Sequence, residues 1–237
     1  TYRDEKQSYG AIGTFTIFPE LNLILRKVKN KIVKGNSLAD IMFVASKFNT
    51  NTLFDDFPIY AGHERRMSSN VLTFDCFHEV EEENDISVYG IVKGNRYISA
   101  RYVDLTDTNI ERYKLILPKA DGNGTFGDTL TNPEILPKRS GFTHTFLGIG
   151  SFMTEAEAKA EMKYVKTKFT RALLGVLKVT QDNNADKWKY VPLQDFTAHS
   201  DIDWSKSVAE IDQQLYRKYG LTADEIEFIE THVKEMA

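Results

Sequence analysis

The feature that most constrains the fold of this sequence is the stretch Thr154–Gln181, which predicts one long amphipathic helix. Thr154 can cap the first free backbone N–H groups, and Glu157 three residues later completes a capping box. Apolar residues then recur at alternating spacings of four and three, at Ala158, Met162, Val165, Phe169, Ala172 and Val176. This spacing places them on one helical face, so we expect that face to be buried and the helix to continue to residue 178.

Basic residues follow a similar spacing on the other faces of this stretch. One row holds Lys159, Lys163 and Lys166, and another holds Lys168, Arg171 and Lys178. The ordinary interpretation is a solvated face whose long side chains cover the edges of the core. A face turned toward nucleic acid is the alternative.

The length of the chain fits one large domain, or one domain with an appendage. It has 237 residues, of which 41% are hydrophobic, and a single cysteine, Cys76. One cysteine excludes an internal disulfide framework. We expect a domain over residues 1–199 and a helical appendage over residues 200–237. No apolar run approaches the length of a membrane span and no signal peptide is visible, so we expect no membrane partner and a cytoplasmic location. The chain opens on Thr1 and is expected to be a fragment of a longer protein.

Charge is distributed unevenly along the chain. The net charge is -4 overall, but residues 105–199 carry 13 basic and 11 acidic residues, whereas residues 200–237 carry 4 basic and 9 acidic. The acidic end could point away from a nucleic acid. The weak basic excess in the middle is no strong nucleic-acid footprint, so composition alone does not indicate DNA binding.

The remaining pattern predicts an α+β fold with a curved antiparallel sheet and packed helices. Helical spacing and caps predict helices, and alternation predicts strands. We expect helices at 21–32, 38–47, 204–219 and 222–235; strands at 71–80, 85–92, 95–105, 113–117 and 142–149; and irregular segments at 49–58, 118–141 and 182–186. A short extended piece is expected at 189–193, and Gly220 is a natural helix-ending residue.

Three runs near the C-terminus resemble a known family. They are TKFTRALLGVLKVTQD, WKYVPLQDF and DIDWSKSVAEIDQQLYRKYGLTADEIEFIE. They resemble the target-recognition region of bacterial restriction-modification adenine methyltransferases, including the fused type II enzymes, and the resemblance extends roughly from Tyr113 to the C-terminus. It implies a catalytic methyltransferase domain elsewhere in the parent chain, which would use S-adenosylmethionine, and double-stranded DNA as a partner.

Catalytic motifs of that family are missing from this chain. The adenine pocket needs a short loop with two prolines and an aromatic residue to hold the flipped base, and no Pro-Pro pair occurs. We therefore expect no cofactor in this chain and no catalytic residue. Gly122, Gly124 and Gly127 spell G-x-G-x-x-G, but no helical pattern follows, so a flexible or DNA-probing loop is the better interpretation than a dinucleotide site.

Nuclease and metal motifs are equally weak. Glu161-Met162-Lys163 has the letters of a Glu-x-Lys nuclease motif, but its outer side chains diverge on a helix. The histidines are scattered, and His144, between two threonines on an expected strand, is interpreted as an ordinary surface or core histidine. No metal site is expected.

DNA contacts would come from basic and amide side chains on protruding segments. The best segment is 119–143. A structureless loop of this length in a compact domain is usually either functional or disordered. The candidates are Lys119, Asn123, Lys138 and Arg139 in that segment, Arg65 and Arg66 after the Pro58 loop, and Lys93 and Arg96 beside Gly94.

The leading hypothesis is a DNA-recognition fragment that is silent in catalysis by itself. The alternative is a protein-docking module of the same enzyme with little direct DNA contact. The net charge of -4 and the acidic C-terminal helices favour the alternative. Salt dependence separates the two, since only binding to phosphates falls steeply with salt.

Overall fold

A computed structural model describes residues 16–32, 36–90, 94–106, 109–122 and 124–236. The α-helices are α1 (Pro19–Lys29), α2 (Thr50–Asp56), α3 (Glu155–Lys166), α4 (Lys168–Leu174), α5 (Val208–Tyr219) and α6 (Ala223–His232). The strands are β1 (Met42–Phe43), β2 (Phe77–His78), β3 (Asp85–Gly90), β4 (Gly94–Ser99), β5 (Tyr113–Pro118), β6 (Glu134–Leu136), β7 (Ser140–Phe142) and β8 (Phe146–Phe152). Short 3-10 helices lie between them, including η1 (Leu38–Ile41) and η5 (Ala185–Trp188).

The strands form two separate sheets, and each sheet combines strands that are not consecutive in the sequence. The first sheet has the order β1-β8-β5-β6 and is antiparallel throughout. The second has the order β2-β4-β3-β7, in which β7 runs parallel to β3. The α+β class is therefore confirmed, and the one parallel pair departs from the expected antiparallel meander.

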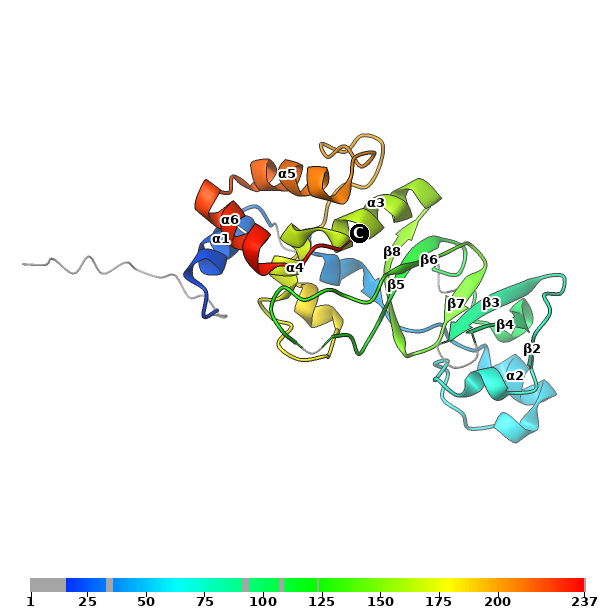
Figure 1. Cartoon of the computed structure of the whole chain (residues 1–237). Coiled ribbons are helices and arrows are strands. Elements are labelled where there is room, and N and C mark those ends of the chain that lie inside the picture. Colours follow the sequence, from blue (N-terminus) through cyan, green and yellow to red (C-terminus); the bar gives the residue numbers. More distant parts are fainter. Residues whose placement is uncertain (1–15, 33–35, 91–93, 107–108, 123, 237) are drawn as a thin grey trace, which may run out of the picture.

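All the α-helices described except α2 gather on one side of the first sheet (Figure 1). Residues of α1, α3, α4, α5 and α6 share one hydrophobic core with the first sheet, and Tyr164, Phe169 and Tyr216 are among its fully buried side chains. We call this part the helical lobe. The C-terminal pair α5–α6 shares that core, while the boundary expected at residues 199–200 stays a prediction.

The second sheet and α2 form a smaller unit at the other end of the molecule (Figure 1). Its core includes Phe48, Leu53, Met67, Ile86 and Ile98. We call residues 44–106 with β7 the β lobe. A third cluster, which includes Ile116, Phe142 and Phe146, joins the two lobes, because the chain passes directly from β7 in the second sheet to β8 in the first.

Several expected elements are confirmed, and others are wrong. The helices at 21–32, 204–219 and 222–235 appear in shortened form as α1, α5 and α6, and Gly220 ends α5 in the left-handed conformation with a φ of 66°. The helix expected at 38–47 is wrong beyond Ile41, where η1 gives way to β1. The loop expected at 49–58 contains α2. The strand expected at 71–80 is wrong except for β2, because the segment begins as a 3-10 helix at Val71–Thr73 and continues through turns.

The long organising helix is broken at Thr167. This residue has an extended backbone (ψ 148°), and its hydroxyl accepts the N–H of Thr170 while donating to the carbonyl of Tyr164. The carboxylate of Asp212 on α5 accepts the N–H groups of Lys168 and Phe169 at 3.0 and 2.8 Å. Because two side chains satisfy the amides that the break frees, the single helix expected over 154–178 becomes α3 and α4.

Candidate functional site

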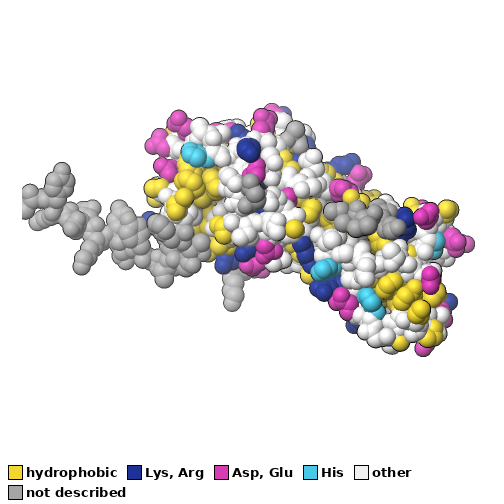
Figure 2. All heavy atoms as spheres, turned by 60° about the horizontal axis from the view of Figure 1, so that its bottom comes forward, with side chains coloured by type: hydrophobic (Ala, Val, Ile, Leu, Met, Phe, Trp, Pro, Cys, Tyr) yellow, Lys and Arg dark blue, Asp and Glu magenta, His cyan; other side chains and the backbone are white. Residues whose placement is uncertain are grey.

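Main-chain hydrogen bonds bring three distant segments together where the lobes meet. The N–H of Lys119, just after β5, donates to the carbonyl of Thr145 at 2.9 Å. The N–H of His144 donates to the carbonyl of Met67, also at 2.9 Å. Arg66, next to Met67, thereby lies close to His144 and Lys119. We call Arg66, Lys119 and His144 the junction cluster, and Figure 2 shows Lys, Arg and His side chains gathered on the surface between the lobes.

Several nitrogen atoms of the junction cluster have no hydrogen-bond partner among the described residues. Within the described ranges, Nε of Arg66 and Nδ1 of His144 are buried and have no hydrogen-bond partner. The Nζ of Lys119 likewise forms no hydrogen bond or ion pair with any described residue. One terminal nitrogen of Arg66 does pair with Glu64, at 3.1 Å. The buried Nε–H of Arg66 is a donor that is costly without an acceptor, and Nδ1 of His144 donates or accepts according to its tautomer, so the cluster has an unmet demand for hydrogen-bond partners.

The electrostatics of the junction cluster point the same way. Burial lowers the pKa of Lys119, and the charge of Arg66 lowers it further, while Asp182 opposes both effects. Burial also lowers the pKa of His144, followed by the charges of Lys119 and Arg66, and Glu64 acts in the opposite direction. Both shifts follow from like charges that lie near one another in partly desolvated positions. The negative charge of an oxyanion beside the cluster would relieve this repulsion.

Two members of the junction cluster are residues that the sequence singles out, in two separate segments. Lys119 opens the expected DNA-binding loop, and Arg66 follows the Pro58 loop. The third, His144, is interpreted from the sequence as an ordinary histidine, and its place beside the two cations depends on pairing between distant segments. No local signal in the sequence could have identified it.

The other candidate residues are not part of this cluster. Arg65 is exposed and pairs with Asp104 at 2.7 Å. Arg96 pairs with Glu79 at 3.0 Å on the β lobe. Asn123 and Lys93 lie outside the described residues.

Lys138 and Arg139 lie between β6 and β7 and differ from one another. Lys138 is exposed, and its ammonium group lies 5.6 Å from the centre of the Tyr113 ring. Arg139 adopts the left-handed conformation with a φ of 57°, and its guanidinium donates to the carbonyl of Asp85 at 3.0 Å. Arg139 thus ties the β6–β7 turn to β3, and Lys138 is the freer of the two.

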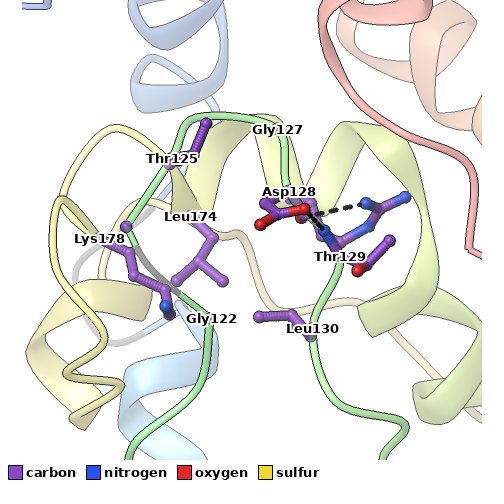
Figure 3. A pocket seen from close by; sticks show the side chains of 11 residues that line it. Gly122, Thr125, Gly127, Asp128, Thr129, Leu130, Leu174 and Lys178 are labelled. Atoms are coloured by element: carbon purple, nitrogen blue, oxygen red, sulfur yellow. Dashed lines mark hydrogen bonds between the residues drawn. The ribbon is translucent and has the colours of Figure 1, made fainter.

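The glycine-rich run packs against helices instead of opening one. Gly122, Gly124 and Gly127 all have positive φ values, and a Cβ on Gly127 would collide with the carbonyl of His232 at the end of α6. Figure 3 shows Lys178 and Leu174 facing the loop that carries Asp128 and Leu130. The cavity between them has a volume of about 20 Å³, room for roughly one water molecule. Close backbone packing thus accounts for the glycine spacing.

Two buried cations line that cavity and are already satisfied. Arg171 donates to the carbonyls of Asp128 and Lys234 at 3.3 and 2.5 Å. Lys178 donates to the carbonyls of Asp121 and Thr180. These residues of the basic rows therefore hold the glycine-rich loop and the C-terminal segment to α4, and they are not on a face open to nucleic acid.

The Glu-x-Lys pair diverges as expected. Glu161 is fully buried, whereas Lys163 reaches the carbonyls of Trp204 and Lys206, both at 2.8 Å. Among the described residues, no group of three or more His, Cys, Asp or Glu side chains could hold a metal ion. No helix in the described ranges is long and apolar enough to cross a membrane. Cys76 is buried, and burial raises the pKa of its thiol to about 12.

Comparison with known proteins adds no relative: no family model and no curated protein matches this sequence. The site must therefore be interpreted from its own chemistry.

Proposed function

We propose that this chain is a DNA target-recognition module of a bacterial restriction-modification adenine-N6 methyltransferase or endonuclease, and that it is silent in catalysis by itself. The observation that carries the proposal is the junction cluster, in which Lys119 and Arg66 meet without carboxylate partners for Lys119 or for Nε of Arg66. Phosphate groups of DNA would pair with the accessible parts of these two cations. The methyltransferase domain and its S-adenosylmethionine would belong to the rest of the parent chain, in the bacterial cytoplasm.

Two further exposed basic side chains extend the proposed interface. Arg65 adjoins Arg66 in sequence, and Lys138 lies on the β6–β7 turn. The acidic segment 200–237 does not oppose this arrangement, because α5 lies along the top of Figure 1, while the basic side chains of Figure 2 come into view when the bottom is turned forward. In this proposal the cluster positions the DNA backbone, and the exposed side chains reach the grooves.

The experiment is fluorescence-anisotropy binding to a random-sequence duplex over a range of salt concentrations. We expect non-specific binding with a Kd on the order of 10⁻⁴ to 10⁻⁶ M at physiological salt. The double variant Arg66→Met/Lys119→Met should weaken it and reduce the slope of log K against log salt by about 1.8, since each lost phosphate contact contributes about 0.9.

A matched double variant controls for net charge. Lys206 lies just before α5 and Arg217 in its last turn, and both are exposed. Lys206→Met/Arg217→Met removes the same charge and should leave the slope unchanged. Equal weakening by both pairs, or no binding at low salt by this chain or by the full-length parent enzyme, would contradict the proposal. Binding of the methyltransferase domain that resists salt would favour the docking alternative.

A further inference from the structure

The imidazole of His144 lies in an unusual position for a neutral ring. It is half-buried, and its Nδ1 is fully buried without a hydrogen-bond partner among the described residues. The charged groups that face it are Lys119 from the end of β5, and Arg66 and Glu64 from the β lobe. Glu64 is itself paired with Arg66 at 3.1 Å, so the net charge around the ring is positive. Burial lowers the pKa of His144 first, and this positive charge lowers it further, so both effects favour the neutral ring.

The neutral and protonated forms of the His144 ring differ in how well they can bind an oxyanion. A neutral imidazole has one donor and one acceptor, whereas the protonated ring has two donors. A phosphate or sulfate oxygen without a proton only accepts. It would also neutralise the charges of Lys119 and Arg66 that oppose protonation. An oxyanion among the three side chains therefore favours the protonated ring, both because that ring has a second donor and because the opposing charges are neutralised.

We propose that Arg66, Lys119 and His144 form a binding site for a single phosphate-like oxyanion, and that His144 takes up a proton when the oxyanion binds. The site deepens the DNA-binding proposal and rests on it for its natural ligand, a backbone phosphodiester. The same chemistry would accept a free phosphate ion. Affinity then rises as the pH falls, because binding and protonation are linked and each strengthens the other by the same factor.

The probe is sulfate, which keeps its double charge between pH 6 and pH 8, so any pH dependence belongs to the protein. Two quantities are measured by NMR: the affinity for sulfate, from sulfate titrations, and the midpoint of the pH titration of the His144 ring. The His144 signal is the one that is absent from the spectrum of His144→Gln. We expect sulfate to bind on the order of fivefold more tightly at pH 6 than at pH 8. Saturating sulfate should raise the midpoint of His144.

Two variants test the assignment. His144→Gln should bind sulfate with nearly the same affinity at both pH values. Lys119→Met should weaken sulfate binding and, without sulfate, raise the midpoint of His144, because a neighbouring cation has gone. Loss of a merely structural side chain would not raise that midpoint. If His144→Gln does not fold, Lys119→Met alone decides. Arg217→Met, which removes an exposed charge on α5, should change neither readout.

Parallel measurements of duplex DNA binding distinguish failure of the oxyanion site from failure of the proposed function. Sulfate binding that depends on Lys119 and on pH, with no duplex binding, would support the oxyanion site and contradict DNA recognition. Duplex binding that depends on the cluster but not on pH would support DNA recognition and overturn the proton uptake. No sulfate binding by the unmodified chain, or an unchanged pH dependence in His144→Gln, would also overturn the inference.

Discussion

Glu161 shows how a single residue can depart from the pattern that surrounds it. Its side chain is fully buried on α3, neither carboxylate oxygen has a hydrogen-bond partner among the described residues, and a Cβ on Gly150 would lie 2.9 Å from one of them. Burial raises the pKa of this carboxyl well above its usual value. The protein therefore holds it as a neutral acid, and ionising it costs folding free energy.

The stability of the protein should consequently depend on pH through Glu161. Because the folded pKa is raised, the contribution of Glu161 is fully present below the unfolded pKa of about 4.3 and is lost as pH rises toward the folded value. We predict that Glu161→Gln is more stable than the unmodified chain at pH 8, by about 1–3 kcal/mol, and that the difference shrinks toward pH 4. Urea unfolding at several pH values measures this.

The exposed Glu227 on α6 provides the control, since Glu227→Gln should leave the pH profile unchanged. A Glu161→Gln profile parallel to that of the unmodified chain would contradict the assignment of a buried neutral acid. The sequence could predict that Glu161 and Lys163 diverge, but it placed Met162 on the buried stripe. In the structure Glu161 is fully buried and Met162 only partly, because α3 packs between the first sheet and α5.

At the scale of elements, the break between α3 and α4 depends on a cap supplied from another helix. Asp212 lies on α5 and is buried, yet its carboxylate accepts the first two N–H groups of α4. Burial raises its pKa to about 6, although those hydrogen bonds pull in the opposite direction. The apolar spacing continues across the break, so the sequence predicts one helix, and the long-range cap decides otherwise.

Removing that cap should therefore weaken the packing of α4 against α5. We predict that Asp212→Ala lowers the free energy of unfolding by about 2 kcal/mol, as expected for a lost helix cap that leaves buried donors unmet. Asp212→Asn should cost less, since one acceptor oxygen remains. Chemical denaturation compares them with Gln213→Ala, an exposed neighbour on the same helix. Equal losses for Asp212→Ala and Gln213→Ala would rule out the cap.

For the whole molecule, the sequence predicts the class of fold better than its connectivity. Helical spacing locates α1 and α5, and spacing with a helix cap locates α6, because those signals are local. The pairing of β7 with β3 and the meeting of Lys119 with Arg66 depend on contacts between segments far apart in the chain. The sequence could therefore name two members of the junction cluster, but it could not bring them together or add His144.

Residues 200–237 carry α5 and α6, whose packing indicates whether this segment is an independent appendage or part of the main domain. α5 and α6 contribute Ile211, Leu215, Tyr216 and Phe228 to the core of the helical lobe. Each buried side chain of this kind is worth about 1.5–3 kcal/mol, and a domain has about 5–15 kcal/mol in total. We predict that a chain ending at residue 199 no longer unfolds cooperatively on heating. Circular dichroism measured as a function of temperature tests this. Cooperative unfolding near the midpoint of the full chain would instead support an independent appendage.

The insertion of the β lobe between β1 and β5 also sets an order of assembly. Both strands flank β8 in the first sheet, and Met42 pairs with Ile149 across more than a hundred intervening residues. β3 and β4, by contrast, form a hairpin whose paired residues are close in sequence. Closing a long loop costs entropy before its contacts form, so local pairings form first. We expect the β3–β4 hairpin to form early on a growing chain, and the first sheet to wait until β8 has been synthesised.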